Sequence, residues 1–151
     1  MTSTPQPLAG LRVVEFTHMV MGPTCGLVLA DLGAEVIKVE PPAGDPSRVM
    51  SPYGANVKGV GIPYLMESRN KRQMTLDLES PEGQENLKRL AKRADMLIET
   101  YAPGQMDAWG IGYRQLRELN PGLIYIAISP YGHYTAKGRE MADMPWTDLT
   151  S

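Results

Sequence analysis

Three short segments place polar residues next to glycine or proline in a way that could bind a ligand. The first runs from His18 to Gly22, where a histidine and three apolar residues precede a Gly-Pro pair. The second begins at Glu40 and continues into a proline-rich stretch, and the third is Thr100 to Gly104. Each follows a run of β-forming residues, and open α/β sheets bind ligands beyond the carboxyl ends of their strands. We therefore expect the three segments to converge on one crevice.

The first segment could belong to a nucleotide-binding turn, because a helix N-terminus can bind phosphate and Glu40 stands where a ribose-binding acid would lie. The glycine spacing disfavours this interpretation. Gly22 and Gly26 have three residues between them, without the G-x-G start of a dinucleotide site or the Lys-Ser/Thr of a P-loop. His18 could serve acid–base chemistry, but a histidine at a strand end more often caps backbone groups.

Other polar and aromatic residues also leave two interpretations open. Asn70, Lys71 and Arg72 stand directly before a predicted strand and could hold phosphate or form a solvated turn. Tyr101 could stack on an aromatic ligand or cover the end of the sheet. The 2 histidines lie far apart and Cys25 is the single cysteine, so we expect no metal site.

Composition excludes several classes of partner. The 15 basic and 17 acidic residues give a formal net charge of -2, which supplies no general attraction for nucleic acid or an anionic membrane. No apolar run approaches the ~20 residues that span a bilayer. The single cysteine fits a reducing compartment. We expect a cytoplasmic protein that binds neither nucleic acid nor membrane.

The hydrophobic pattern predicts alternating strands and helices. Leu27, Leu29, Ala30 and Leu32 share a helical face that ends at Gly33, and a second helix begins at Ser80 with proline in its first turn. A third helical region lies between 101 and 120, and 41–63 is expected to be a long loop. The predicted strands are 11–16, 35–40, 73–78, 95–100 and 123–129, of which the last is expected to be fully buried. The alternation predicts an α/β fold with a mostly parallel sheet flanked by helices.

Several segments taken in order resemble the class III CoA-transferases, a family that includes formyl-CoA and carnitine CoA-transferases and the α-methylacyl-CoA racemases. The resemblance runs from about Leu8 to the end of the chain and is more specific than any single motif. It is carried by LAGLRVVEFTHMVMGP, LADLGAEVIKVEPPAGDPSR, NKRQMTLDLESPEG, ADMLIETYAPGQMDAWGIGYRQLRELNPGLIYIAISPYG and MPWTDLT.

This resemblance implies a Rossmann-like CoA-binding domain over 11–129, after a lead at 1–10 and before the start of a further segment at 130–151. The family fold would be incomplete in this chain, and complete members form an interlocked homodimer. The implied reaction moves coenzyme A between an acyl-CoA and a carboxylic acid acceptor: an aspartate attacks the thioester and forms an acyl-enzyme anhydride. A racemase-like enzyme and a non-catalytic CoA-binding fragment or subunit are the alternatives.

The resemblance also assigns residues to the CoA site. His18 to Met21 match the first CoA-contacting turn, and within it Val20 and Met21 match positions that touch the cofactor. The segment along the adenosine portion is matched by Leu76, Asp77, Leu78 and Glu79. The later turn, which often reads Asn-Phe-Gly, is matched by Thr100, Tyr101 and Ala102. A further contact segment is matched by 145–148, with Asp148 near the bound CoA or acting as a helix N-cap.

The sequence departs from the pattern of this family in two ways, which concern phosphate charge and catalysis. Pro41 and Ala108 stand where some members have arginine, so the phosphate charge must be met elsewhere. We rank Arg72 first among the available cations, which are Arg48, Lys71, Arg72 and Lys137. The nucleophilic aspartate of the transferases is expected beyond Ser151, so the chain alone is expected to be inactive.

Overall fold

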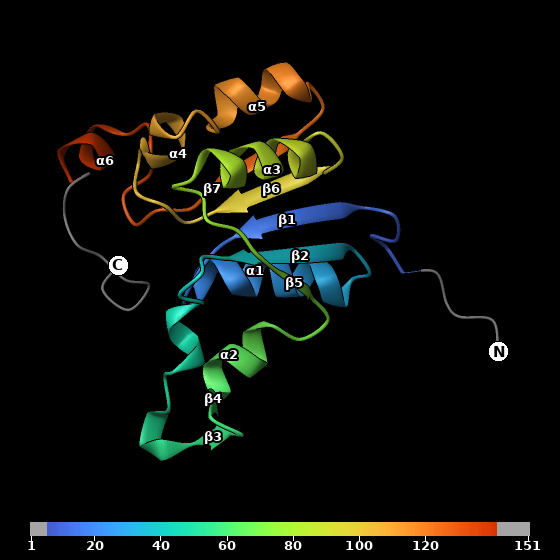
Figure 1. The fold of residues 1–151 in the computed structure, drawn as a ribbon, viewed down its shortest axis with the longest axis vertical. Coiled ribbons are helices and arrows are strands. Elements are labelled where there is room, and N and C mark those ends of the chain that lie inside the picture. The colour runs from blue at the N-terminus through green and yellow to red at the C-terminus, as the bar shows by residue number, and fades with distance from the viewer. Residues whose placement is uncertain (1–5, 142–151) are drawn as a thin grey trace.

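The computed structural model describes residues 6–141, and its centre is a parallel β-sheet. The sheet has five strands in the order β5-β2-β1-β6-β7, and every neighbouring pair is parallel (Figure 1). Their bounds are β1 Arg12–Phe16, β2 Glu35–Glu40, β5 Arg72–Thr75, β6 Met96–Glu99 and β7 Ile124–Ala127. The predicted α/β fold with a mostly parallel sheet is confirmed.

Helices cover both faces of this sheet. Helix α1 (Met21–Asp31) packs on one face, where Val13, Ala30 and Ile98 share a buried cluster. Helices α3 (Pro81–Ala91) and α5 (Tyr113–Leu119) lie on the opposite face (Figure 1). None of the helices within 6–141 has the length and apolar character needed to cross a bilayer.

Helix α3 shows how local sequence sets an element. The Ser80 side chain accepts a hydrogen bond from the backbone N–H of Gly83 at 3.0 Å, and Pro81 follows in the first turn. Both features favour a helix start, as predicted. Leu87 and Ala91 are fully buried on its inner face, so burial of one apolar stripe fixes the helix against the sheet.

The segment 41–63 is not the structureless loop that its composition predicts. It contains two short 3-10 turns (Pro46–Arg48 and Pro52–Gly54), a hairpin of β3 (Asn56–Val57) and β4 (Val60–Gly61), and the start of α2 (Ile62–Glu67). The hairpin turn has positive φ at both Lys58 (52°) and Gly59 (82°), which is the pattern of a tight two-residue hairpin. The first position of such turns is usually Asn, Asp or Gly, so a lysine there did not indicate a hairpin in the sequence.

The strand predicted at 123–129 is also different. Strand β7 is an edge strand of the described sheet, and its Ile124 side chain is 54% exposed, so the prediction of a fully buried strand was wrong. Helices α4 (Gln105–Ala108) and α6 (Ala136–Glu140) are short and complete the helices of residues 6–141.

Candidate functional site

The direction of chain winding reverses between β1 and β6. From β1 the chain crosses through α1 to β2, whereas from β5 it returns through α3 to β6, which lies on the other side of β1. Ligands of open α/β sheets bind at the carboxyl ends of the strands at such a switch point. The predicted first and third turns, His18–Gly22 and Thr100–Gly104, follow these two strands and therefore meet there.

A direct contact joins the two turns. The Thr100 hydroxyl accepts a hydrogen bond from the backbone N–H of His18 at 3.2 Å and lies 2.9 Å from the His18 ring Nδ1. Thr100 is 1% exposed and His18 is half-buried, so the hydroxyl side of this contact lies in the interior. The structure thus brings together two residues that the resemblance assigns to the CoA site.

The first turn is tightly constrained. Met19 has φ 64°, a left-handed conformation that non-glycine residues adopt at a cost. A Cβ atom on Gly22 would lie 2.5 Å from Cβ of Thr17 and 2.7 Å from Cγ2 of Thr100, so no larger residue fits. The neighbouring Val20 and Met21 side chains are 40% and 37% exposed, so both are accessible to a ligand.

The second turn is closed by a polar cluster around Glu40. Arg48 donates to both carboxylate oxygens, at 2.7 and 3.0 Å, and the Tyr64 hydroxyl donates at 2.6 Å. The backbone N–H of Asp45 donates a further bond at 3.0 Å. Burial alone would raise the pKa of Glu40, but these hydrogen bonds hold it below its usual value. Glu40 and Arg48 therefore hold the 41–63 segment against the sheet, an arrangement that does not fit a ribose-binding acid.

Lys71 faces the interior rather than solvent. Its side chain is 0% exposed, and Nζ lies 2.8 Å from a carboxylate oxygen of Glu15 and donates to the backbone carbonyl of Pro23 at 2.7 Å. Burial lowers the pKa of Lys71, whereas the nearby carboxylate raises it. The structure places Lys71 under the start of α1, so neither the phosphate role nor the solvated turn describes this residue.

Two phosphate candidates remain exposed, at opposite ends of the strands. Arg72 is 78% exposed and forms an ion pair of 2.9 Å with Glu35 at the start of β2, so it lies away from His18 and Thr100. Lys137 follows β7 on the exposed surface, with Nζ 4.9 Å from the centre of the Tyr131 ring. The structure does not bring Arg72 to the switch point, and its role in phosphate binding stays a prediction.

The third turn is built on a buried carboxylate. Glu99 is 1% exposed at the end of β6, accepts from the backbone N–H of Tyr101 at 2.7 Å, and accepts from the Tyr125 hydroxyl at 3.3 Å. Burial raises the pKa of Glu99 to about 7. The Tyr101 ring packs edge-on against Trp109, with ring centroids 5.1 Å apart. Tyr101 therefore covers the end of the sheet, as one of the two interpretations predicted, while Ala102 is exposed.

The predicted adenosine segment has mixed exposure. Leu78 is 5% exposed and belongs to the core, whereas Asp77 and Glu79 are exposed. The Asp77 side chain accepts from the backbone N–H of Glu79 at 3.0 Å, which shapes the bend before α3. Leu76 is half-buried and is the member of this segment that lines a cavity.

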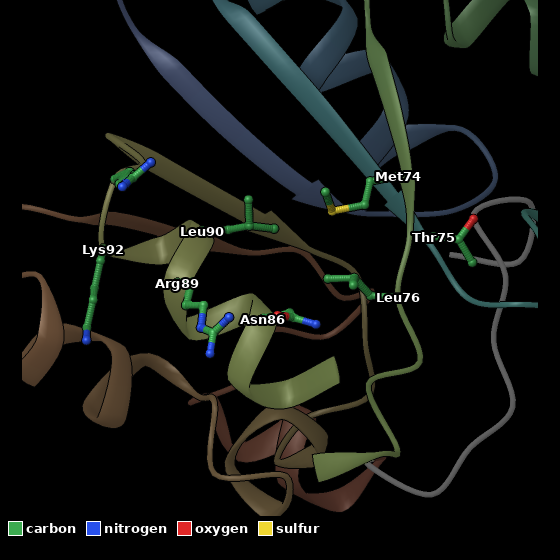
Figure 2. Close-up of a pocket in the computed structure, with 8 residues that line it drawn as sticks. Met74, Thr75, Leu76, Asn86, Arg89, Leu90 and Lys92 are labelled. Carbon is green, nitrogen blue, oxygen red and sulfur yellow. The ribbon is translucent and has the colours of Figure 1, made fainter. Parts of the chain in front are cut away.

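That cavity of ≈ 590 Å³ lies between the β5 edge and α3. Figure 2 shows Leu90 of α3 facing Met74 and Leu76 across it. The remaining lining residues are Thr75, Asn86, Arg89, Lys92 and Arg93. Only Leu76 is shared with the predicted CoA-contact residues, so this cavity is separate from the turns at the switch point.

The contact segment at 145–148 and the absence of a metal site are the last two sequence-based expectations. Asp148 and the rest of its predicted contact segment lie outside the described residues. Within 6–141, no group of three or more His, Cys, Asp or Glu side chains is arranged to hold a metal ion. The sequence did not single out four charged residues that are buried beside the turns: Glu15, Lys38, Asp45 and Glu99.

Comparisons with known proteins identify related chains. The chain is 46% identical over 129 residues to succinyl-CoA–D-citramalate CoA-transferase of Chloroflexus aurantiacus, a match that covers 85% of this chain and 32% of that protein. It is 38% identical over 128 residues to human succinyl-CoA:glutarate CoA-transferase, covering 84% and 29%. The chain therefore spans about a third of the length of these curated relatives.

A solved structure and a family model lead to the same assignment. The crystal structure of a CAIB/BAIF family protein from Brucella suis superposes with a TM-score of 0.86 at 38% identity, covering 97% of this chain and 38% of that one. The family model described as CoA-transferase family III matches residues 8–150. This chain belongs to CoA-transferase family III.

Proposed function

We propose that this chain supplies the CoA-binding portion of an enzyme that transfers coenzyme A between an acyl-CoA and a carboxylic acid. The observation that carries the proposal is the contact between Thr100 and His18, which unites the two turns at the switch point of the sheet. Two relatives whose names state such a transfer share 46% and 38% identity with this chain.

Four features of the first turn support this site. Val20 and Met21 present exposed apolar surface suited to the pantetheine part of CoA, while the start of α1 places the positive end of a helix nearby. The first turn of α1 contains no acidic residue that would repel phosphate. His18 is fixed by its contacts with Thr100, so we propose that it orients the turn and the ligand.

The proposed chemistry is nucleophilic catalysis by a carboxylate. An aspartate attacks the thioester carbonyl, the carbon–sulfur bond breaks, and CoA leaves as a thiolate while the acyl group is held as a mixed anhydride. We propose that this aspartate comes from sequence beyond Ser151, so the role of this chain is to bind CoA and the complete site forms in a homodimer. Asp148 is proposed to lie near bound CoA rather than to be the nucleophile.

Isothermal titration of the purified chain with CoA and with NAD tests the binding claim. The expected result is saturable binding of CoA and none of NAD. Binding of NAD without CoA would contradict the proposal. A parallel titration of Arg72→Gln measures the predicted phosphate contact, and an affinity for CoA equal to that of the unmodified chain would remove Arg72 from the site.

A further inference from the structure

Two lysines lie in the interior directly behind the first turn. Lys38 stands in β2 and Lys71 directly precedes β5, and both side chains are 0% exposed. Lysine is almost never fully buried unless its charge is paired. The partners of these two ammonium groups therefore show what the buried charges do.

Each lysine holds a backbone carbonyl on one side of the turn. Lys38 Nζ donates to the carbonyl of Thr17 at 2.8 Å, immediately before His18. Lys71 Nζ donates to the carbonyl of Pro23 at 2.7 Å, in the first turn of α1. The segment between these two carbonyls is the one that the family resemblance assigns to CoA contact.

Carboxylates complete the network and balance its charge. Asp45 lies 2.8 Å from Lys38 Nζ, while Glu15 lies 2.8 Å from Lys71 Nζ and 3.8 Å from Lys38 Nζ. Burial raises the pKa of Glu15, and the two lysines lower it. Two lysines and two carboxylates thus form a buried cluster whose members depend on one another, because removal of one partner leaves an uncompensated charge.

The turn itself requires such support. Met19 has φ 64°, and a Cβ atom on Gly22 would overlap with atoms of Thr17 and Thr100. A strained backbone persists only where its surroundings over-determine it. The two lysine–carbonyl bonds, together with the Thr100–His18 contact, supply fixed points on the turn and on both sides of it.

We propose that Lys38 and Lys71 are positioning residues that hold the turn His18–Met21 in the conformation that binds CoA. This inference rests on the proposed function. Neither lysine touches the ligand in this role. They act by fixing the carbonyls of Thr17 and Pro23, so that the turn is ordered before CoA arrives and less conformational entropy is lost on binding.

Two charge-neutral double variants test the inference on the full chain. Glu15→Gln with Lys71→Met removes one negative and one positive charge together with the bond to Pro23. Asp45→Asn with Lys38→Met does the same for the bond to Thr17, and serves if the first variant does not fold. Each is expected to weaken CoA binding at least tenfold in isothermal titration. Amide hydrogen exchange should become faster in peptides covering 17–24 and stay unchanged in α3.

A matched control separates positioning from general stability. Leu116→Ala truncates a fully buried side chain on the opposite face of the sheet. It should lower Tm while leaving CoA affinity and exchange at 17–24 unchanged. Equal losses of CoA affinity in this control and in the double variants would overturn the positioning role.

The other outcomes distinguish failure of the positioning role from failure of the proposed function. If the unmodified chain and the double variants bind CoA equally well, the inference fails and the proposed function stands. If the unmodified chain does not bind CoA, the proposed function fails and a role in CoA binding fails with it. If CoA affinity falls in the double variants while exchange at 17–24 is unchanged, the lysines do not act by holding the turn.

Discussion

Thr100 and His18, which are 82 residues apart in the chain, are joined by a hydroxyl that contacts both the backbone and the ring of the histidine. The backbone N–H bond measures 3.2 Å and the separation from Nδ1 is 2.9 Å. A hydroxyl has one proton to donate and two lone pairs, so a single side chain can serve both contacts. The pairing makes the ends of β1 and β6 one unit, and the conformation of the first turn depends on the third.

Replacement of Thr100 by valine tests this dependence. Valine keeps the shape of threonine but leaves the half-buried His18 N–H without this partner, so unfolding free energy should fall by about 1 to 3 kcal/mol. CoA affinity should fall as well, because the turn is less fixed. Thr100→Ser is the matched control and should retain most of both properties. Urea denaturation and titration measure them, and a valine variant equal to the serine variant would contradict the role of the hydroxyl.

Gly26 is predicted to be required by the buried carboxylate beneath α1. A Cβ atom there would lie 1.6 Å from Oε2 of Glu15 and 3.2 Å from Nζ of Lys71. Glycine in a helix interior normally costs about 1 kcal/mol relative to alanine, so Gly26→Ala would ordinarily stabilise the protein. Here the carboxylate must move and loses its ion pair, so we expect a loss of about 2 to 4 kcal/mol in chemical denaturation.

Gly122→Ala provides the comparison for that experiment. The nearest atom to a Cβ atom at this position is Oδ1 of Asn120 at 3.7 Å, an ordinary contact distance. Its unfolding free energy should change by less than about 0.5 kcal/mol. A Gly26→Ala variant as stable as Gly122→Ala would show that Glu15 moves aside without cost.

Regular alternation made the sheet and its main helices predictable. The strand predicted at 35–40 has the observed bounds of β2, and Ser80 and Pro81 correctly marked the start of α3. These features depend on local sequence, through hydrophobic periodicity and capping chemistry. The meeting of the first and third turns followed from topology, because parallel strands bring their carboxyl ends to one edge.

The charged residues were harder to assign because their partners are distant in the chain. Arg48 and Lys71 were candidates for phosphate binding, yet their charges pair with Glu40 and Glu15. A usable signal was present: Glu15 and Lys38 are opposite charges flanked by apolar residues inside two predicted strands, and they lie opposite each other in the register of β1 and β2. Register is a tertiary property, so sequence reasoning on each strand alone did not reveal the pair.

Tyr64 is predicted to hold the 41–63 segment through its hydroxyl. The side chain is 3% exposed, donates to Glu40 at 2.6 Å, and stacks under the guanidinium of Arg48, whose carbon lies 4.0 Å from the ring centre. Tyr64→Phe keeps the stacking but removes both the bond to Glu40 and the bond that Arg48 donates to the same hydroxyl. Stability should therefore fall by about 1 to 2 kcal/mol. Trypsin should then cleave faster after Lys58.

Tyr53→Phe is the control for this change, because Tyr53 belongs to the same segment and its side chain is fully exposed. Its stability and its rate of tryptic cleavage should match those of the unmodified chain. If Tyr64→Phe also left the cleavage rate unchanged, the Tyr64 hydroxyl would not be what restrains the segment.

Glu99 should make stability depend on pH in the direction opposite to that of an ordinary paired carboxylate. Burial raises its pKa from 4.5 to about 7 in the folded state. Between these values the folded protein keeps the proton and the unfolded chain releases it, so stability falls as pH rises. This difference in pKa between the folded and unfolded states corresponds to a loss of about 3 kcal/mol of stability between pH 4.5 and pH 7.

The variant Glu99→Gln tests this pH dependence. Glu99→Gln cannot ionise, yet its amide oxygen can still accept from Tyr101. The difference in unfolding free energy between Glu99→Gln and the unmodified chain should therefore grow in favour of the variant from pH 5 to pH 8. Parallel pH profiles would show that Glu99 is ionised in the folded protein throughout this range.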